Sequence, residues 1–162
     1  MPGALEGLRV LDLTEREGHL CGRLLADLGA EVIKIEPPEG DPSRHVGPFA
    51  SNSSGIESSL TFINLNTNKK SVALDLDSED GRQAFRLLAR DADAVVETFA
   101  PGTLEAWGLD YETLSQENPG LVMVSISSFG QTGPYSQWPG YDLIIQGMGG
   151  LMGIPGAPGG PP

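Results

Sequence analysis

The residues best placed to do chemistry follow a β-branched run at residues 32–35, which predicts a short buried strand. Glu36 ends this strand. Pro37 and Pro38 then force the chain out of a sheet, because proline has no N–H to donate to a neighbouring strand. Open α/β sheets bind their ligands just beyond the carboxyl ends of their strands. The sequence therefore indicates a ligand site close to Glu36.

Other reactive side chains lack the spacing that their chemistry requires. His19 and His45 have no carboxylate or nucleophile paired with them in the sequence, which predicts surface or capping roles. Ser127 and Ser128 do not lie in the G-x-S-x-G turn of hydrolases, so an acyl-serine mechanism is not expected. Cys21 is the single cysteine, which excludes an internal disulfide, and no Cys/His cluster has zinc-site spacing. We therefore expect no bound metal.

The chain is acidic, with a formal net charge of −12 at pH 7. Nucleic acids and anionic membranes attract basic surfaces, so neither is expected as a partner. An anionic small ligand would need local donors, although basic residues in loops are usually just solvated. Four basic residues in or beside predicted loops could act as donors: Lys34, Arg44, Lys69 and Lys70. The absence of a leader at Met1 and of a membrane-length apolar run predicts a soluble, cytoplasmic protein.

Strands and helices alternate along the chain and would position these groups. The predicted strands are residues 8–13, 32–35, 72–77, 94–97 and 121–126. The first helix has an apolar face and a stop at Gly29. That face comprises Leu20, Cys21, Leu24, Leu25 and Leu28. Further helices begin at Ser78, after residue 102, at Asp110 and at Asp142, and a long polar connection covers residues 41–71.

This order predicts an α/β fold with a Rossmann-like, mostly parallel sheet and flanking helices, incomplete at the C-terminus. Residues 1–148 would form one domain. Residues 149–162 would form a Gly/Pro-rich loop without a regular element, at which the chain stops. The turn at residues 14–22 lacks the G-x-G-x-x-G of dinucleotide-binding folds, which disfavours a nicotinamide site.

Five tracts of the sequence, in order and at matching spacing, carry a family resemblance. They are LADLGAEVIKIEPPEGDPSR, LNTNKKSVALDLDSEDGR, ETFAPGTLEAWGLDYETL, NPGLVMVSISSFGQTGPY and PGYDLIIQGMGGLMGIPG. Together they resemble the family III CoA-transferases of the CaiB/BaiF type, which include formyl-CoA transferases. The resemblance spans nearly the whole chain.

The resemblance implies an enzyme that moves CoA between an acyl-CoA and a carboxylic acid, with a Rossmann-like CoA domain in an interlocked homodimer. It also implies an aspartate nucleophile, which forms an acyl anhydride and then an enzyme–CoA thioester. In the family this aspartate lies shortly after the segment matching residues 160–162, and the chain ends before it. Either the chain is the N-terminal part of a longer subunit, or another polypeptide completes it. Alone it is expected to be inactive.

The resemblance also implies which residues contact CoA. Glu17 and Gly18 match the turn that approaches the thioester, where relatives commonly have glutamine and alanine. Pro37 and Ala106 stand where arginines occur in relatives, and loss of such cationic contacts would weaken the grip on phosphates. The remaining matches are Leu74, Asp75, Leu76 and Asp77 beside the adenine, and Thr98, Phe99 and Ala100 in a further turn.

Tyr141 and Asp142 match the vicinity of the active site and bear on the kind of reaction. Racemases that resemble these enzymes have a histidine base at the position of Tyr141, and tyrosine is a poor base at neutral pH. This favours transfer over racemisation, although a racemase stays possible if later sequence supplies a second base. Asp142 could equally cap a helix. A non-catalytic CoA-binding or assembly module is the other alternative, because several contact positions are substituted.

Overall fold

A computed structural model describes residues 3–50 and 55–154 of the chain. The chain divides into two compact units, Met1–Ile126 and Ser127–Pro162. The first holds the sheet and the second a short helical segment. This division falls after Ile126. The domain boundary predicted between residues 148 and 149 stays a prediction.

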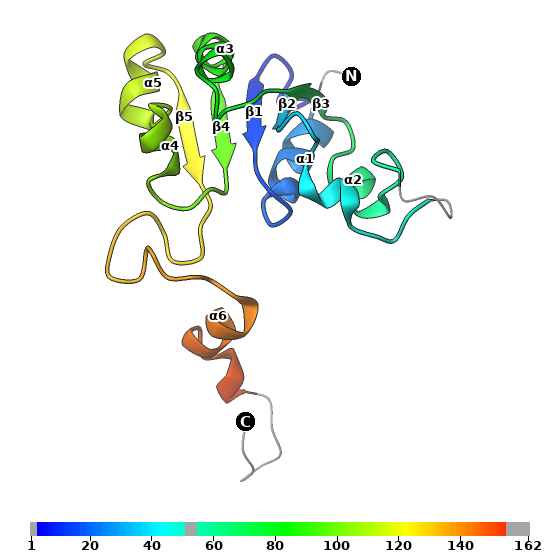
Figure 1. Cartoon of the computed structure of the whole chain (residues 1–162), viewed down its shortest axis with the longest axis vertical. Helices are drawn as coiled ribbons and strands as arrows, with labels where there is room; N and C mark the ends of the chain where they lie inside the picture. Colours follow the sequence, from blue (N-terminus) through cyan, green and yellow to red (C-terminus); the bar gives the residue numbers. More distant parts are fainter. Residues whose placement is uncertain (1–2, 51–54, 155–162) are drawn as a thin grey trace. The chain divides into compact units, whose positions relative to one another are not determined.

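The first unit is built on a five-stranded sheet in which all strands run parallel (Figure 1). The strands are β1 (Arg9–Leu13), β2 (Glu31–Glu36), β3 (Lys70–Ala73), β4 (Ala94–Glu97) and β5 (Val122–Ser125). Their order is β3-β2-β1-β4-β5, and Val10 pairs with both Val32 and Ala94. The predicted Rossmann-like sheet is therefore confirmed. The edge strand β3 ends at Ala73, so most of the strand predicted at residues 72–77 lies beyond it.

Most helices of this unit begin at a capping side chain, whereas two begin at Gly18 and Gly102 without one. The helices are α1 (His19–Asp27), α2 (Leu60–Leu65), α3 (Glu79–Arg90), α4 (Thr103–Trp107) and α5 (Tyr111–Glu117), with a 3₁₀ turn η1 (Pro42–His45). Ser78 accepts a hydrogen bond from the Gly81 N–H, and Asp110 accepts one from the Thr113 N–H. The polar connection at residues 41–71 is not structureless, because it contains η1 and α2.

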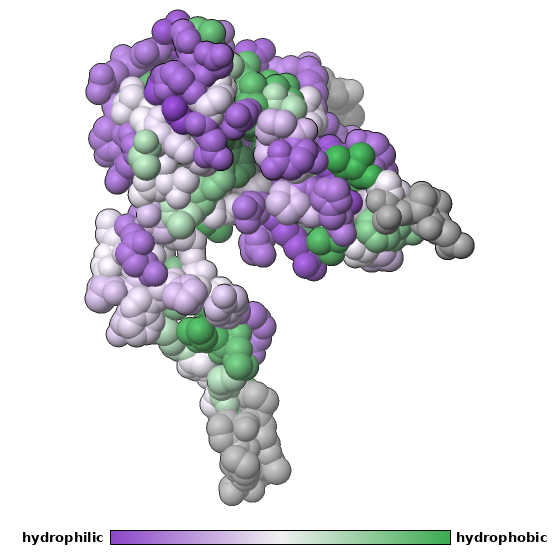
Figure 2. Space-filling model, in the orientation of Figure 1, coloured by the Kyte–Doolittle hydropathy of each residue, from purple (hydrophilic) through white to green (hydrophobic). Residues whose placement is uncertain are grey.

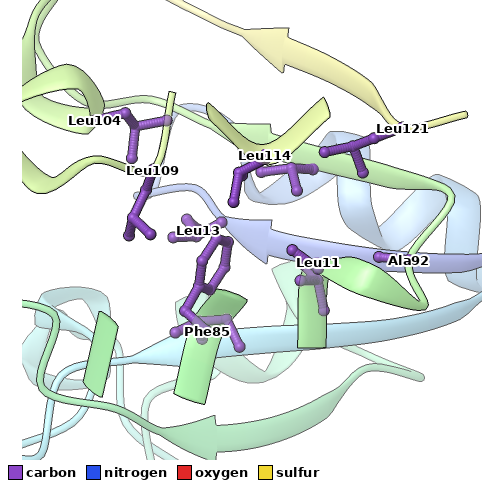
Figure 3. Packing of buried hydrophobic residues seen from close by; sticks show 11 residues of the cluster. Leu11, Leu13, Phe85, Ala92, Leu104, Leu109, Leu114 and Leu121 are labelled. Carbon is purple, nitrogen blue, oxygen red and sulfur yellow. The ribbon is translucent and has the colours of Figure 1, made fainter. Parts of the chain in front are cut away.

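Two apolar clusters lie on opposite faces of the sheet, because successive strand residues point to opposite sides. Val10, Val32 and Val96 pack with Ala26 of α1 and Ala30. The larger cluster joins alternate strand residues to α3, α4 and α5 (Figure 3). Its members include Leu11, Leu13, Val95, Phe85, Leu104, Leu109 and Leu114. This arrangement is the three-layered α/β sandwich expected of a doubly wound sheet.

Only part of the apolar face predicted for α1 faces the sheet, since Cys21 and Leu25 pack against the smaller cluster. Leu20, Leu24 and Leu28 are 49%, 53% and 50% exposed, whereas Gly22 and Ala26 are buried. The helix instead approaches the sheet on its small side chains, since a Cβ at Gly22 would lie 2.2 Å from Asp12 Oδ2. Three of the five residues of the predicted face therefore lie on the outer side of the helix.

The second unit contains α6 (Asp142–Met148) and a 3₁₀ turn η2 (Leu151–Gly153). The turn is a regular element inside the predicted Gly/Pro-rich loop, and the rest of that loop, residues 155–162, lies outside the described residues. Apolar side chains of α6, among them Leu143 and Met148, are exposed, and Figure 2 shows apolar surface on this segment. No helix in the described ranges combines the length and apolarity needed to cross a membrane.

Candidate functional site

A cleft of about 380 Å³ lies where the carboxyl ends of the parallel strands meet. Thr14 follows β1, Pro37 follows β2 and Phe99 follows β4, and all three line it. The chain order of the strands reverses between β1 and β4, and a ligand crevice is expected at such a switch point. These strand ends therefore share one rim, which also includes Glu36.

One part of the cleft lining is aromatic and apolar. The rings of Phe99 and Trp107 meet edge to face, with centroids 5.2 Å apart at 83°. The Phe99 N–H donates to Glu97 Oε2 at 2.6 Å, and this buried carboxylate fixes the turn after β4. Leu74 and Leu76 complete the apolar lining. Such a surface suits a flat heteroaromatic ring.

The rest of the lining is acidic. Four lining carboxylates are exposed and form no ion pair with a described residue: Glu15, Glu39, Asp75 and Asp77. Lys34 also lines the cleft, but its Nζ lies 2.9 Å from Asp41 Oδ2. A polyanionic ligand would therefore meet net negative charge on this part of the chain.

The basic residues proposed as loop donors are already engaged. Arg44 pairs with Glu36, Lys69 with Asp12 and Lys70 with Glu31. Arg44, Lys34 and the Lys69 side chain are buried rather than solvated. Burial lowers the pKa of Lys69, against the opposing effect of the Asp12 carboxylate. These side chains hold the loops in place and are not available as free cations.

Glu36, the leading candidate from the sequence, lines the cleft but is buried and fully engaged. Its oxygens accept hydrogen bonds from Arg44 Nε and Nη2, from Ser71 Oγ and from the Asp41 N–H. Burial alone would raise the pKa of Glu36, but the hydrogen bonds from Arg44, Ser71 and Asp41 outweigh it and lower the pKa to about 2. Glu36 is thus an anchor for the loop after β2, not an exposed acid or base.

His19 is buried and paired, which corrects its predicted surface role. Its Nε2 lies 3.1 Å from both Asp41 Oδ2 and the carbonyl oxygen of Thr14, and its Nδ1 lies 3.2 Å from Asn66 Nδ2. Burial would raise the pKa of Asp41, but the hydrogen bond with His19 and the charge of Lys34 hold it well below its usual range. The long connection is thereby fixed to the end of β1.

The predicted CoA contacts fall into two groups. Those that line the cleft are Pro37, Leu74, Asp75, Leu76, Asp77 and Phe99. Glu17, Ala100 and Ala106 are exposed and do not line it. Gly18 and Thr98 lie next to it: Thr98 Oγ1 accepts from the Glu15 N–H at 2.7 Å, and a Cβ at Gly18 would lie 2.6 Å from Thr14 Cβ.

Tyr141 and Asp142 belong to the second unit, at the start of α6. Tyr141 is the N-cap residue without a side-chain cap, and Asp142 is the first helical residue. Asp142 Oδ2 accepts a hydrogen bond from Gln146 Nε2 at 2.6 Å, so the capping role considered for it was wrong. Both residues are exposed.

Sequence reasoning missed Trp107 and Glu15 as cleft residues. Trp107 gave one usable signal. It is the last residue of the short helix α4, which follows the turn after β4, so the chain cannot carry it far from that turn. Within residues 3–50 and 55–154, no group of three or more His, Cys, Asp or Glu side chains is placed to hold a metal ion.

Comparison with known proteins identifies the family. The model of CoA-transferase family III matches residues 5–162. Succinyl-CoA–D-citramalate CoA-transferase of Chloroflexus aurantiacus is 45% identical over 99% of this chain and 40% of its own length. Succinate–glutarate CoA-transferase of Agrobacterium fabrum is 45% identical over 98% of this chain and 40% of its own length.

Solved structures give the same result. A CaiB/BaiF family protein from Brucella suis superposes with a TM-score of 0.89 at 44% identity, covering 98% of this chain and 42% of that one. Rv3272 from M. tuberculosis gives a TM-score of 0.88 at 38% identity, covering 99% and 44%. The chain thus spans about two fifths of the length of these relatives. On the family match and these likenesses, the chain belongs to the family III CoA-transferases.

Proposed function

We propose that this chain supplies the CoA-binding cleft of an enzyme that moves CoA from an acyl-CoA to a free carboxylic acid. The names of its relatives give that activity with different substrate pairs, such as succinate and glutarate, or acetyl-CoA and oxalate. The observation that carries the proposal is the cleft at the strand ends, with its aromatic wall of Phe99 and Trp107. A cleft at this place in a doubly wound sheet is where a nucleotide would bind.

A CoA thioester fits the cleft unevenly. Its adenine would gain contact with Phe99 and Trp107, an aromatic contact worth about 0.5–1.5 kcal/mol beyond area burial. The residues from Leu74 to Asp77 would also lie beside the adenine, and Pro37 near the rest of the nucleotide. Glu17, Gly18, Thr98, Ala100 and Ala106 remain proposed contacts outside the lining. Among the described residues, the acidic lining provides no free cationic side chain to pair with the CoA phosphates. We therefore expect the affinity for CoA to come mainly from the apolar wall.

The reaction would proceed through a carboxylate nucleophile. An aspartate oxygen attacks the thioester carbonyl and the C–S bond breaks. CoA departs as the thiolate, and an acyl–aspartyl anhydride is formed. The thiolate then attacks the aspartyl carbonyl, which releases the donor acid and forms an enzyme–CoA thioester. The acceptor acid attacks that thioester to give a second anhydride, from which CoA takes up the new acyl group. Following the family resemblance, we propose that this aspartate lies beyond Pro162 and that Glu17 belongs to the vicinity of the acyl group.

Two measurements on the complete protein test the proposal. Calorimetry with CoA and acetyl-CoA should show binding, and an acyl-exchange assay with pairs of carboxylic acids should show transfer. The DNA sequence downstream of Pro162, or of a partner gene, should encode the aspartate. Absence of that aspartate together with absence of exchange would contradict the enzymatic proposal.

A non-catalytic CoA-binding or assembly module is the second candidate, because the contact positions Glu17, Pro37, Thr98 and Ala106 differ from those of the family. The carboxylates of Glu15, Glu39, Asp75 and Asp77 would weaken binding of a phosphate-rich ligand. CoA binding without acyl exchange would support this module over the enzyme. Absence of binding would leave a structural role.

The assembly is also part of the proposal. Following the family resemblance, we propose an interlocked homodimer in the cytoplasm. Sedimentation velocity of the complete protein should give a single species of twice the subunit mass, and a monomer at micromolar concentration would contradict it.

A further inference from the structure

The polar wall of the cleft rests on a cluster of buried side chains that come from distant parts of the chain. The cluster comprises Asp12, Thr14, His19, Lys34, Asp41, Asn66 and Lys69. Three of these residues, Thr14, Lys34 and Asp41, also line the cleft. What fixes the cluster therefore also fixes the surface that a ligand meets.

Thr14 is the residue on which the cluster converges. Its N–H and Oγ1 both donate to Asp12 Oδ1, at 2.9 and 2.6 Å. Its carbonyl oxygen accepts from Lys34 Nζ at 2.5 Å and lies 3.1 Å from His19 Nε2. With three side chains on its backbone and hydroxyl, Thr14 cannot move unless one of them moves.

The hydrogen bonds assign the protons of His19. Lys69 Nζ, which can only donate, lies 2.8 Å from Asn66 Oδ1, so the amide oxygen of Asn66 faces Lys69. Its Nδ2 then donates to the Phe62 carbonyl and toward His19 Nδ1. Nδ1 is therefore the acceptor, and Nε2 carries the hydrogen that is shared between Asp41 and Thr14.

The charges around His19 are already balanced. Lys69 pairs with Asp12 at 2.6 Å, and Lys34 pairs with Asp41 at 2.9 Å. A further buried charge would have no partner of its own in this cluster, which agrees with a neutral imidazole. His19 thus contributes directional hydrogen bonds rather than charge.

We propose that His19 is a positioning residue for the cleft. It joins three segments at one ring: the turn after β1 through Thr14, the loop after β2 through Asp41, and the residues after α2 through Asn66. Among the residues that the structure describes, no other side chain forms hydrogen bonds with all three of these residues. The role rests on the proposed function, because the ligand that the wall meets is the CoA thioester.

The test compares two changes at His19 with a change in the core. His19→Leu keeps a side chain of similar size and removes both ring nitrogens, and His19→Gln keeps one N–H donor and one acceptor. Leu114→Ala changes a buried residue on the other face of the sheet that does not itself line the cleft, and it destabilises the fold. Each variant of the complete protein is assayed for KM of the acyl-CoA, for kcat and for thermal stability.

A positioning role predicts a rise in KM without loss of kcat, because the wall contacts the ligand equally before and during reaction. We expect KM to rise roughly tenfold in His19→Leu and to return most of the way in His19→Gln. Leu114→Ala should lower the melting temperature and leave KM unchanged. If His19→Leu behaves as Leu114→Ala does, or if it lowers kcat and kcat/KM equally, the proposal is overturned.

A spectroscopic measurement separates this proposal from the proposed function. The ¹⁵N chemical shifts of the His19 ring should be those of a neutral imidazole with the hydrogen on Nε2. A hydrogen on Nδ1, or on both nitrogens, overturns the assignment on which the positioning role rests. If the wild-type protein binds no CoA thioester, the proposed function fails and the positioning role falls with it, whatever the ring shifts show.

Discussion

Arg44 and Glu36 form a two-pronged ion pair at the carboxyl end of β2. Nε and Nη2 of the guanidinium donate to Oε2 and Oε1 of the carboxylate, at 2.6 and 2.8 Å. The guanidinium carbon also lies 3.7 Å from the centroid of the Phe62 ring. Both side chains are buried, so the pair ties η1 and α2 to the end of the strand.

This ion pair should make the fold sensitive to acid. Hydrogen bonds hold the pKa of Glu36 at about 2, below the 4.5 of an ordinary glutamate. The stabilisation is therefore complete above pH 4.5 and is lost as the pH falls toward 2, with an amplitude of about 3 kcal/mol. Asp41, whose pKa is also lowered, acts in the same direction. Urea unfolding at several pH values in this window measures the loss.

Glu36→Gln tests the assignment. It should flatten the acid dependence of the free energy of unfolding, while lowering stability at neutral pH because the buried Arg44 keeps only the exposed Glu57 as a carboxylate partner. Glu105→Gln is the control, since Glu105 is exposed and forms no ion pair with a described residue. If the free energy of unfolding of Glu36→Gln falls with decreasing pH as steeply as that of the wild type, other titrating groups cause the acid sensitivity.

Gly18→Ala should disturb the turn after β1. Its Cβ would lie 2.6 Å from Thr14 Cβ and 2.7 Å from Thr98 Cγ2, so the turn must shift. We expect a loss of about 1–3 kcal/mol in the free energy of unfolding and weaker binding of CoA. Gly120→Ala is the matched control, because its new Cβ would meet nothing closer than 3.7 Å. Equal stability of the two variants would argue against the crowding.

Trp107 should carry part of the affinity for CoA. Trp107→Ala removes half of the aromatic wall, and we expect the Kd for CoA to rise about 3- to 30-fold. Trp107→Phe, which keeps an aromatic ring, should lie much nearer to wild type. Calorimetry gives the affinities, and circular dichroism shows whether the fold survives. Unchanged affinity in the alanine variant would place the nucleotide elsewhere.

Asp77→Asn should strengthen CoA binding. The change removes one unpaired carboxylate from the lining next to a polyanionic ligand, and we expect the Kd to fall about 2- to 5-fold at low salt. The gain should shrink as salt is added, because exposed charges are screened. Glu105→Gln again serves as the control, since Glu105 does not line the cleft. Weaker binding in Asp77→Asn would mean that the carboxylate contacts the ligand favourably.

The sheet could be predicted from the sequence because its signals are local. Each strand is a short apolar or alternating run that ends at a turn residue, and Ser78 and Asp110 cap the helices that follow. The parallel order then brings the strand ends to one edge, so a cleft near Pro37 and Phe99 follows from topology alone.

The face of α1 could not be predicted in the same way. Periodicity identifies the leucine stripe but does not say what covers it. The residues that meet the sheet, Gly22 and Ala26, have little hydrophobic signal of their own. Close approach of the backbone, not apolar area, sets the orientation of this helix.

The cluster around His19 was out of reach for a different reason. Its partners Asp41 and Asn66 lie 22 and 47 residues away, and no spacing rule links side chains that meet only through tertiary structure. The same holds for Asp12 and Lys69, which are 57 residues apart. Isolated polar residues in a sequence therefore say little about burial when the loops between them fold back on the sheet.

Gly22 occupies a position at which no larger residue fits. The methyl group of an alanine there would fall 2.2 Å from Asp12 Oδ2 and 3.0 Å from Lys69 Nζ, at the ion pair beneath the first turns of α1. In a library of random variants, every substitution at this position should be selected out. Leu20 and Leu24, on the outer side of the same helix, should accept polar residues freely.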